Sequence, residues 1–252
     1  MSTLERPDAS LFYEASGEGP PLLLTHGFAA TSRMWRGQAD TFRESHQVIR
    51  WDLRGHGRSS SPDDPAAYSQ EKALGDMVAL LDALGHEQAI VGGLSLGGYL
   101  SLAFHAAHPE RVRALVVIDA GPGYKSEAPR KEWNEMARGL ADRLEQRGLG
   151  HLAKLSAEMD PGEHRSARGL ALAARGILTQ QDARVIEALP TISVPTLIIV
   201  GEKDRTYRGP AAYMAERIPG AEKVVIPDAG HAVNLHQPER FDAALGAFLA
   251  RL

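Results

Sequence analysis

The stretch Gly-Gly-Leu-Ser-Leu-Gly-Gly, residues 92–98, comes directly after the apolar run Ala-Ile-Val of residues 89–91. It opens into a helical pattern, which predicts Ser95 at the bend between a buried strand and a helix. So sharp a bend strains the backbone of its central residue, and only small neighbours such as Gly93 and Gly97 fit beside it. The Ser95 hydroxyl is thereby presented at a sheet edge, where a nearby base would make it a nucleophile.

Short aliphatic runs alternate with helical patterns along the whole chain. The runs at residues 115–118 and 197–200 contain only Leu, Ile and Val, which is typical of parallel strands buried on both faces. The alternation predicts an α/β fold with a doubly wound, mostly parallel sheet. The expected strands are Leu11–Glu14, Leu22–Thr25, Gln47–Asp52, Ala89–Gly93, Ala114–Asp119, Thr196–Gly201 and Lys223–Pro227, and the clearest helices are Leu74–Leu84, Leu96–Ala107 and Phe241–Leu252.

Composition narrows the function classes. The 252 residues are 43% hydrophobic, and the net charge of −4 comes from mixed signs, with no basic stripe for nucleic acid. The chain has no cysteine, which excludes disulfides, a cysteine nucleophile and thiolate metal sites. Neither a signal peptide nor an apolar run of about 18 residues is visible, so we expect a cytoplasmic protein without nucleic-acid or membrane partners.

One region breaks the alternation of strand and helix. Residues 121–190 carry helical patterns and no clear strand, beginning with a helix between Pro129 and Gly148. We predict a core domain of residues 1–120 and 191–252, into which this segment is inserted as a helical lid over the carboxyl edge of the sheet. The alternative is a single enlarged crossover. Shorter helices are expected at residues 151–158, 166–179 and 182–189.

A serine nucleophile needs a base and a group that orients it. His231 is the candidate base, because it lies on the loop after the last strand, at the same sheet edge as Ser95. Asp204 follows the strand of residues 197–200 and is the candidate partner of the imidazole. Asp119 is its rival, since it also ends a strand, whereas Asp228 is assigned to the turn before His231.

Attack on a carbonyl also creates an oxyanion that needs fixed donors. One predicted donor is the backbone N–H of Leu96, directly after the nucleophile and at a helix N-terminus. The other is the backbone N–H of Phe28, in the segment Thr-His-Gly-Phe of residues 25–28, which leaves an earlier strand.

Together these motifs resemble the α/β-hydrolase superfamily over nearly the whole chain. The matching pieces are His26–Phe28, Asp52–Ser59, Gly93–Gly98, Gly201–Asp204 and Gly230–His231. The resemblance implies that His56 and Arg58 belong to the scaffold. The N-terminus departs from the family pattern: only Leu11–Glu14 clearly precedes the strand Leu22–Thr25, so we expect the usual first strand to be very short or missing. Epoxide hydrolases and haloalkane dehalogenases share the frame but carry an aspartate as nucleophile, so Ser95 argues against both.

Within that superfamily the chain looks like the small cofactor-free esterases and 3-oxoadipate enol-lactonases. The expected activity is hydrolysis of carboxylic esters of small or medium size through an acyl-enzyme, with no cofactor and no metal; His105 and His108 are interpreted as surface residues. The alternatives are an enol-lactonase, a carbon–carbon bond hydrolase of aromatic degradation, and a non-catalytic small-ligand receptor. The expected partner is a small-molecule ester or lactone substrate, and the sequence leaves the oligomeric state open.

Substrate preference depends on side chains whose positions relative to the site are predicted less directly by the sequence pattern. Trp133, Met136 and Leu140 recur at helical spacing and line an apolar acyl pocket, or else pack the lid onto the core. Phe28, Met34 and Trp35 are expected on the other side of the site. An anionic lactone would require a lid arginine in the pocket, and Arg130, Arg138 and Arg168 are the candidates.

Overall fold

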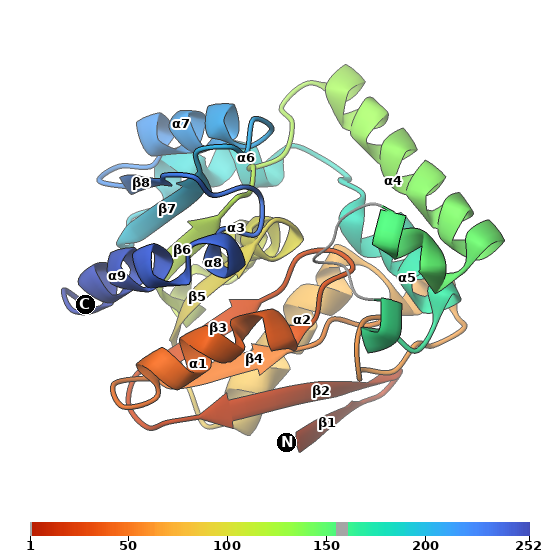
Figure 1. The fold of residues 1–252 in the computed structure, drawn as a ribbon, viewed down its shortest axis with the longest axis horizontal. Coiled ribbons are helices and arrows are strands. Elements are labelled where there is room, and N and C mark those ends of the chain that lie inside the picture. The colour runs from red at the N-terminus through yellow and green to blue at the C-terminus, as the bar shows by residue number, and fades with distance from the viewer. Residues whose placement is uncertain (1, 155–160) are drawn as a thin grey trace.

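The central feature is one eight-stranded sheet with the strand order β1-β2-β4-β3-β5-β6-β7-β8 (Figure 1). The computed structural model describes residues 2–154 and 161–252. The chain runs from β3 to β4 on one side of β3 and reaches β5 on its other side, so the sheet is doubly wound and the order reverses at β3. Its strands are β1 Ser2–Arg6, β2 Ala9–Ser16, β3 Pro21–Thr25, β4 Gln47–Trp51, β5 Ala89–Leu94, β6 Val112–Ile118, β7 Thr196–Gly201 and β8 Glu222–Ile226.

The first strand, which we expected to be very short or missing, is present and spans the five residues Ser2–Arg6. β1 pairs antiparallel with β2, from Ser2 opposite Tyr13 to Arg6 opposite Ala9, and β2 pairs antiparallel with β4. No residue of β1 is fully buried. An edge strand with little buried surface does not need a run of aliphatic residues, and this is why the hydrophobic pattern missed it.

Helices cover both faces of the sheet. Trp35, Phe42 and Phe241 belong to the apolar cluster on the face covered by α1 and α9, whereas Met77 and Phe104 belong to the cluster under α2 and α3 (Figure 1). The helices are α1 Arg36–Phe42, α2 Gln70–Ala83, α3 Leu96–Ala107, α4 Glu127–Arg147, α5 Ala167–Ala173, α6 Arg184–Ala188, α7 Arg208–Arg217, α8 Val233–His236 and α9 Pro238–Leu249. Among the described residues, no helix is long and apolar enough to cross a membrane.

Within the described residues, 119–154 and 161–195, all regular structure between β6 and β7 is helical. α4 ends as predicted, with Gly148 at a φ of 67°, and begins at Glu127, two residues before Pro129. A π-helical turn, Ala174–Leu178, follows α5, and 3-10 turns span Leu149–Lys154, Pro161–Glu163 and Leu189–Thr191. Further 3-10 turns in the core span Ser32–Trp35, Pro65–Ala67 and Pro109–Arg111. The predicted helix at residues 151–158 lies partly outside the described residues.

The prediction that His105 is a surface residue is wrong. His105 lies on α3 and is only 5% exposed, whereas the side chain of His108, just after this helix, is 36% exposed. Burial lowers the pKa of His105, so its imidazole is held in the neutral form. A histidine near the end of an apolar helix looks exposed in the sequence, but α3 is buried almost to its last turn.

Candidate active site

The bend after β5 holds Ser95 in a conformation that L-residues rarely adopt, with φ 56° and ψ −114°. Its backbone N–H donates to the carbonyl of Ile118 at 2.9 Å, which ties the bend to β6. A Cβ at Gly93 or Gly97 would collide with the carbonyl of Thr25 at the end of β3. The two glycines are therefore required by the close approach of β3 and α3, and the strain at Ser95 fits the predicted nucleophile position.

His231 is paired with Asp204 by a short hydrogen bond. Its Nδ1 lies 2.7 Å from the Asp204 Oδ2, and the other Asp204 oxygen accepts the N–H groups of Thr206 and Tyr207 at 3.2 and 3.3 Å. Because the carboxylate only accepts, Nδ1 carries the proton and Nε2 is left as the basic nitrogen. Gly201 permits this pairing, since a Cβ there would collide with the carbonyl of Gly230, next to His231. Asp228, with a φ of 63°, forms the turn.

Asp119 lies directly behind the pair and does not bond to His231. Ligand atoms of Asp119, Asp204 and His231 lie within 4.8 Å of one another. The Asp119 Oδ1 accepts the N–H of Gly201 at 2.8 Å, and the carboxyl also interacts with the Asp204 carboxylate. Burial, with help from the neighbouring Asp204 charge, raises the pKa of Asp119 to about 8. The carboxyl is therefore protonated at neutral pH and can donate to Asp204.

Asp204 keeps its negative charge in this environment. Burial acts to raise its pKa, but the hydrogen bond and charge of His231, with the Tyr207 N–H and Asp119, together lower it below the ordinary value.

The side chains of Asp119, Asp204 and His231 are poorly arranged for a metal ion. The 2.7 Å between His231 Nδ1 and Asp204 Oδ2 is the distance of a direct hydrogen bond, and a cation would have to displace the proton that joins them.

The loop after β3 lies against the nucleophile. A Cβ at Gly27 would be 3.4 Å from the Ser95 Cβ, which brings the following residue, Phe28, to the same edge. His26 fastens this loop: its Nε2 accepts the N–H of Leu53 at 3.0 Å, so its Nδ1 donates to the Gly27 carbonyl at 2.7 Å. Among the described residues, no acceptor takes the Phe28 N–H.

The scaffold interpretation of the loop after β4 agrees with the contacts. Asp52 accepts the N–H groups of Ser32 at 2.6 Å and Arg58 at 2.8 Å, and the guanidinium of Arg58 lies over the Phe12 ring. The His56 ring packs edge-on against Phe28 at 5.3 Å. Burial holds the pKa of His56 well below its usual range, so the ring is a neutral support of the loop.

Comparison with known proteins gives this arrangement a family. A family model described as alpha/beta hydrolase fold matches residues 20–238. The chain belongs to this family. Its fold resembles an esterase from Thermogutta terrifontis, with a TM-score of 0.87 and 31% identity, covering 99% of this chain and 96% of the other.

Two curated relatives of this α/β hydrolase are themselves named as hydrolases. The chain is 30% identical to 3-oxoadipate enol-lactonase 2 from Acinetobacter baylyi, over 99% of its own length and 96% of the relative. It is 34% identical to 2-hydroxymuconate semialdehyde hydrolase from Pseudomonas putida, over 93% and 88% of the two chains. These two relatives are both hydrolases by name and differ in the substrates that their names state.

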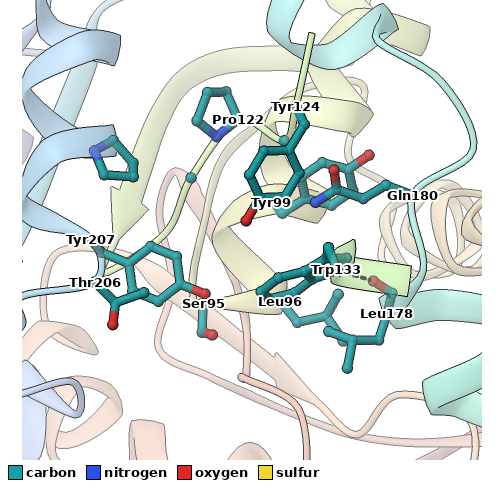
Figure 2. Close-up of a pocket in the computed structure, with 13 residues that line it drawn as sticks. Ser95, Leu96, Tyr99, Pro122, Tyr124, Trp133, Leu178, Gln180, Thr206 and Tyr207 are labelled. Carbon is teal, nitrogen blue, oxygen red and sulfur yellow. Dashed lines mark hydrogen bonds between the residues drawn. The ribbon is translucent and has the colours of Figure 1, made fainter. Parts of the chain in front are cut away.

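A cavity of about 100 Å³ opens beside Ser95 of this hydrolase. Trp133 lies in its wall, as the sequence predicts (Figure 2). Its indole Nε1 donates to the Leu178 carbonyl at 2.9 Å, which fixes the ring. The lining residues are Ser95, Leu96, Tyr99, Gly121, Pro122, Gly123, Tyr124, Trp133, Leu178, Gln180, Thr206, Tyr207 and Pro210, and none of them is charged.

Three residues predicted to bind substrate do not line this cavity. Trp35 is fully buried on the other face of the sheet, with its ring 6.4 Å from that of Phe241, because the turn after β3 directs it into the core. Met136 is 43% exposed, and Leu140 packs against the core cluster. α4 therefore places Trp133 in the cavity wall but uses Leu140 for packing against the core. Helical spacing alone does not show which residues of the apolar face line the cavity.

Tyr207, which the sequence reasoning missed, links the two halves of the site. Its ring stacks on the His231 imidazole, with centroids 5.1 Å apart and planes at 22°. Its hydroxyl points toward Ser95 (Figure 2). Burial raises the pKa of the Tyr207 hydroxyl to about 12, although the interaction with Ser95 acts to lower it. The hydroxyl therefore stays protonated. Its place three residues after Asp204, in a loop already assigned to the site, is the signal that would have found it.

Proposed function

We propose that this α/β hydrolase cleaves neutral carboxylic esters with a small acyl group through a covalent acyl-enzyme. The single observation that carries the proposal is the pairing of His231 with Asp204 at the sheet edge where Ser95 occupies its strained bend. A base with a free Nε2 and an oriented Nδ1 is what a serine hydroxyl needs to attack a carbonyl.

The reaction follows from these groups. The Ser95 hydroxyl attacks the ester carbonyl while the His231 Nε2 takes its proton, and Asp204 stabilises the imidazolium that forms. The N–H groups of Phe28 and Leu96 receive the oxyanion. The imidazolium then protonates the departing alcohol, and the neutral imidazole activates a water molecule that releases the acid.

Neutral esters are favoured over anionic lactones by the charge of the cavity. Each of the three arginines considered for an anionic substrate has another environment: Arg130 bonds to the Tyr124 carbonyl, Arg168 pairs with Asp63, and Arg138 is exposed. An anion brought into a cavity lined by no cation would lose hydration without gaining a partner. The cavity of about 100 Å³ supports a short acyl chain. On this proposal residues 121–190 act as the cap of the site.

The test is hydrolysis of p-nitrophenyl esters from acetate to decanoate by the wild type and by Ser95→Ala. We expect turnover by the wild type that is highest for the shorter chains and falls by about 10⁴-fold or more in the variant. A fluorophosphonate probe should label Ser95 in the wild type only. Turnover that survives in Ser95→Ala would reject the serine mechanism, and ligand binding without any turnover would favour a receptor.

A further inference from the structure

The wall of the cavity opposite Tyr207 contains a buried amide whose oxygen has no partner. Gln180 is 7% exposed and reaches from the inserted segment toward Tyr99 and Tyr124 (Figure 2). Its Oε1 is buried without a hydrogen-bond partner among the described residues. Native proteins rarely leave a buried amide oxygen in this state, because it has lost its water and gained nothing in exchange.

The backbone around Gln180 is fixed, so its side chain is not placed there by loose packing. Asn134 on α4 brackets the residue, accepting the Gln180 N–H at 2.7 Å and donating to the Gln180 carbonyl at 2.8 Å. The preceding carbonyls are held too, that of Leu178 by Trp133 and that of Thr179 by the Gln70 amide at 2.6 Å. Three successive carbonyls are thus bonded to side chains from two helices.

The neighbouring Tyr99 hydroxyl and the backbone at Gly123 do not serve as partners of the amide oxygen. A Cβ at Gly123 would lie 2.8 Å from the Gln180 Oε1 and 3.3 Å from the Tyr99 ring, so the glycine makes the room that the amide occupies. The Tyr99 hydroxyl donates to the Oε1 of a different residue, Gln70, at 3.3 Å. A leucine would fill the same volume without burying a polar group, which makes the amide a costly choice unless a ligand uses it.

We infer that Gln180 determines specificity by binding a hydroxyl group carried by the ester substrate. This inference rests on the proposed ester hydrolysis. A hydroxyl suits the amide best, because it can donate to Oε1 and accept from Nε2, and the amide exchanges these atoms by rotating about its last bond. A carboxylate is disfavoured by the uncharged wall, and a ketone or ether can only accept.

The experiment uses pairs of esters that differ by one methyl-to-hydroxyl exchange. For the acyl side the pairs are methyl butanoate with methyl 3-hydroxypropanoate, and methyl hexanoate with methyl 5-hydroxypentanoate. For the alcohol side the pair is propyl butanoate with 2-hydroxyethyl butanoate. The ratio of kcat/KM within each pair, measured by proton release, reports the recognition of the hydroxyl, and the pair that responds tells which half of the ester enters the cavity.

The variant is Gln180→Leu, and the matched control is Gln181→Leu, at a neighbouring exposed position outside the cavity. We expect Gln180→Leu to lower the ratio of kcat/KM for the hydroxylated ester to that for its apolar partner by about tenfold in at least one pair. The control should leave every ratio unchanged. Gln180→Met serves if the leucine variant does not fold, as judged by circular dichroism.

The inference and the proposed function fail in different ways. If the wild type cleaves the apolar esters and the ratios do not change on replacing Gln180, the inference is overturned while the serine esterase stands. If both members of every pair lose activity equally, Gln180 has only a structural role and the inference is again overturned. If the wild type cleaves no ester of either kind, the proposed function fails and the inference falls with it.

Discussion

The two sides of the cavity are built by different means. On one side, Ser95, Asp204 and His231 lie on loops that directly follow β5, β7 and β8, so the positions of their backbones are set by the sheet. On the other side, Trp133 and Gln180 belong to the segment between β6 and β7, which is held both by apolar packing against the core and by hydrogen bonds between side chains and backbone. If these sides have the proposed roles, we expect that substitutions can alter reaction chemistry and substrate choice separately.

The largest expected effect is on the strand-end side. Replacing Asp204 by Asn keeps the shape but lets the imidazole adopt the wrong tautomer, and we expect kcat for every ester to fall by about 10⁴-fold. Asp119→Asn is the matched control, because an amide resembles the protonated carboxyl already present there. We expect it to retain activity within tenfold. Should Asp119→Asn be the more damaging variant, the assignment of the acid would have to be exchanged.

A smaller, selective effect is expected on the inserted side. Trp133→Ala removes the ring from the cavity wall and its bond to the Leu178 carbonyl. The acyl-chain optimum should move to longer esters, with kcat/KM for acetate falling about tenfold while Ser95 is still labelled by a fluorophosphonate. Met136→Ala on the exposed face of the same helix should leave the profile unchanged. An unaltered chain-length profile in Trp133→Ala would mean that this side does not choose the substrate.

The smallest expected effect is on stability and comes from Asp119. Its carboxyl keeps a proton up to a pKa of about 8 in the folded protein, against an ordinary value of 3.8. Between these values unfolding releases a proton, so raising the pH favours unfolding, by up to about 1.4 kcal/mol per pH unit. The amide of Asp119→Asn has no such proton to release, so this contribution to the pH dependence is absent from the variant.

Thermal unfolding between pH 5 and pH 8 measures this difference. The Tm of Asp119→Asn minus that of the wild type should grow with pH by a few degrees per unit, given roughly 2–4 °C for each kcal/mol in a chain of this size. Comparing the two proteins at each pH cancels the contribution of the other titrating groups. A difference that does not vary with pH would show that Asp119 is ionised in the folded protein.

Much of the sheet side could be predicted from the chain alone. The bend at Ser95 and the strands around it were placed correctly, because glycine spacing and aliphatic runs are local signals. Asp204 and Asp119 each lie shortly after the end of a strand. The residue pattern therefore favours Asp204 as the partner of His231 but leaves Asp119 as an alternative. The 2.7 Å contact with His231 separates them, since it depends on how the loops after β7 and β8 pack around Gly201.

The inserted side was predicted less well, for a physical reason. Helical spacing indicates which residues share a face, but α4 uses its apolar face for two purposes, packing and the cavity wall. Trp133 therefore lines the cavity while Leu140 does not. Gln180 gives no signal in the sequence, because a polar side chain in a loop becomes informative only when its partners, or their absence, are known. The one signal for Tyr207 is its place three residues after Asp204.

The sequence by itself determined the doubly wound α/β core, the strained position of Ser95 and the set of groups that gather at the carboxyl edge. These features follow from local backbone preference and from the fact that parallel strands end together. Only the tertiary structure decided which aspartate holds His231, that Trp35 faces the core, that β1 completes the edge, and that the Gln180 amide is buried without a partner. Each of these depends on contacts between segments far apart in the chain, which periodicity does not record.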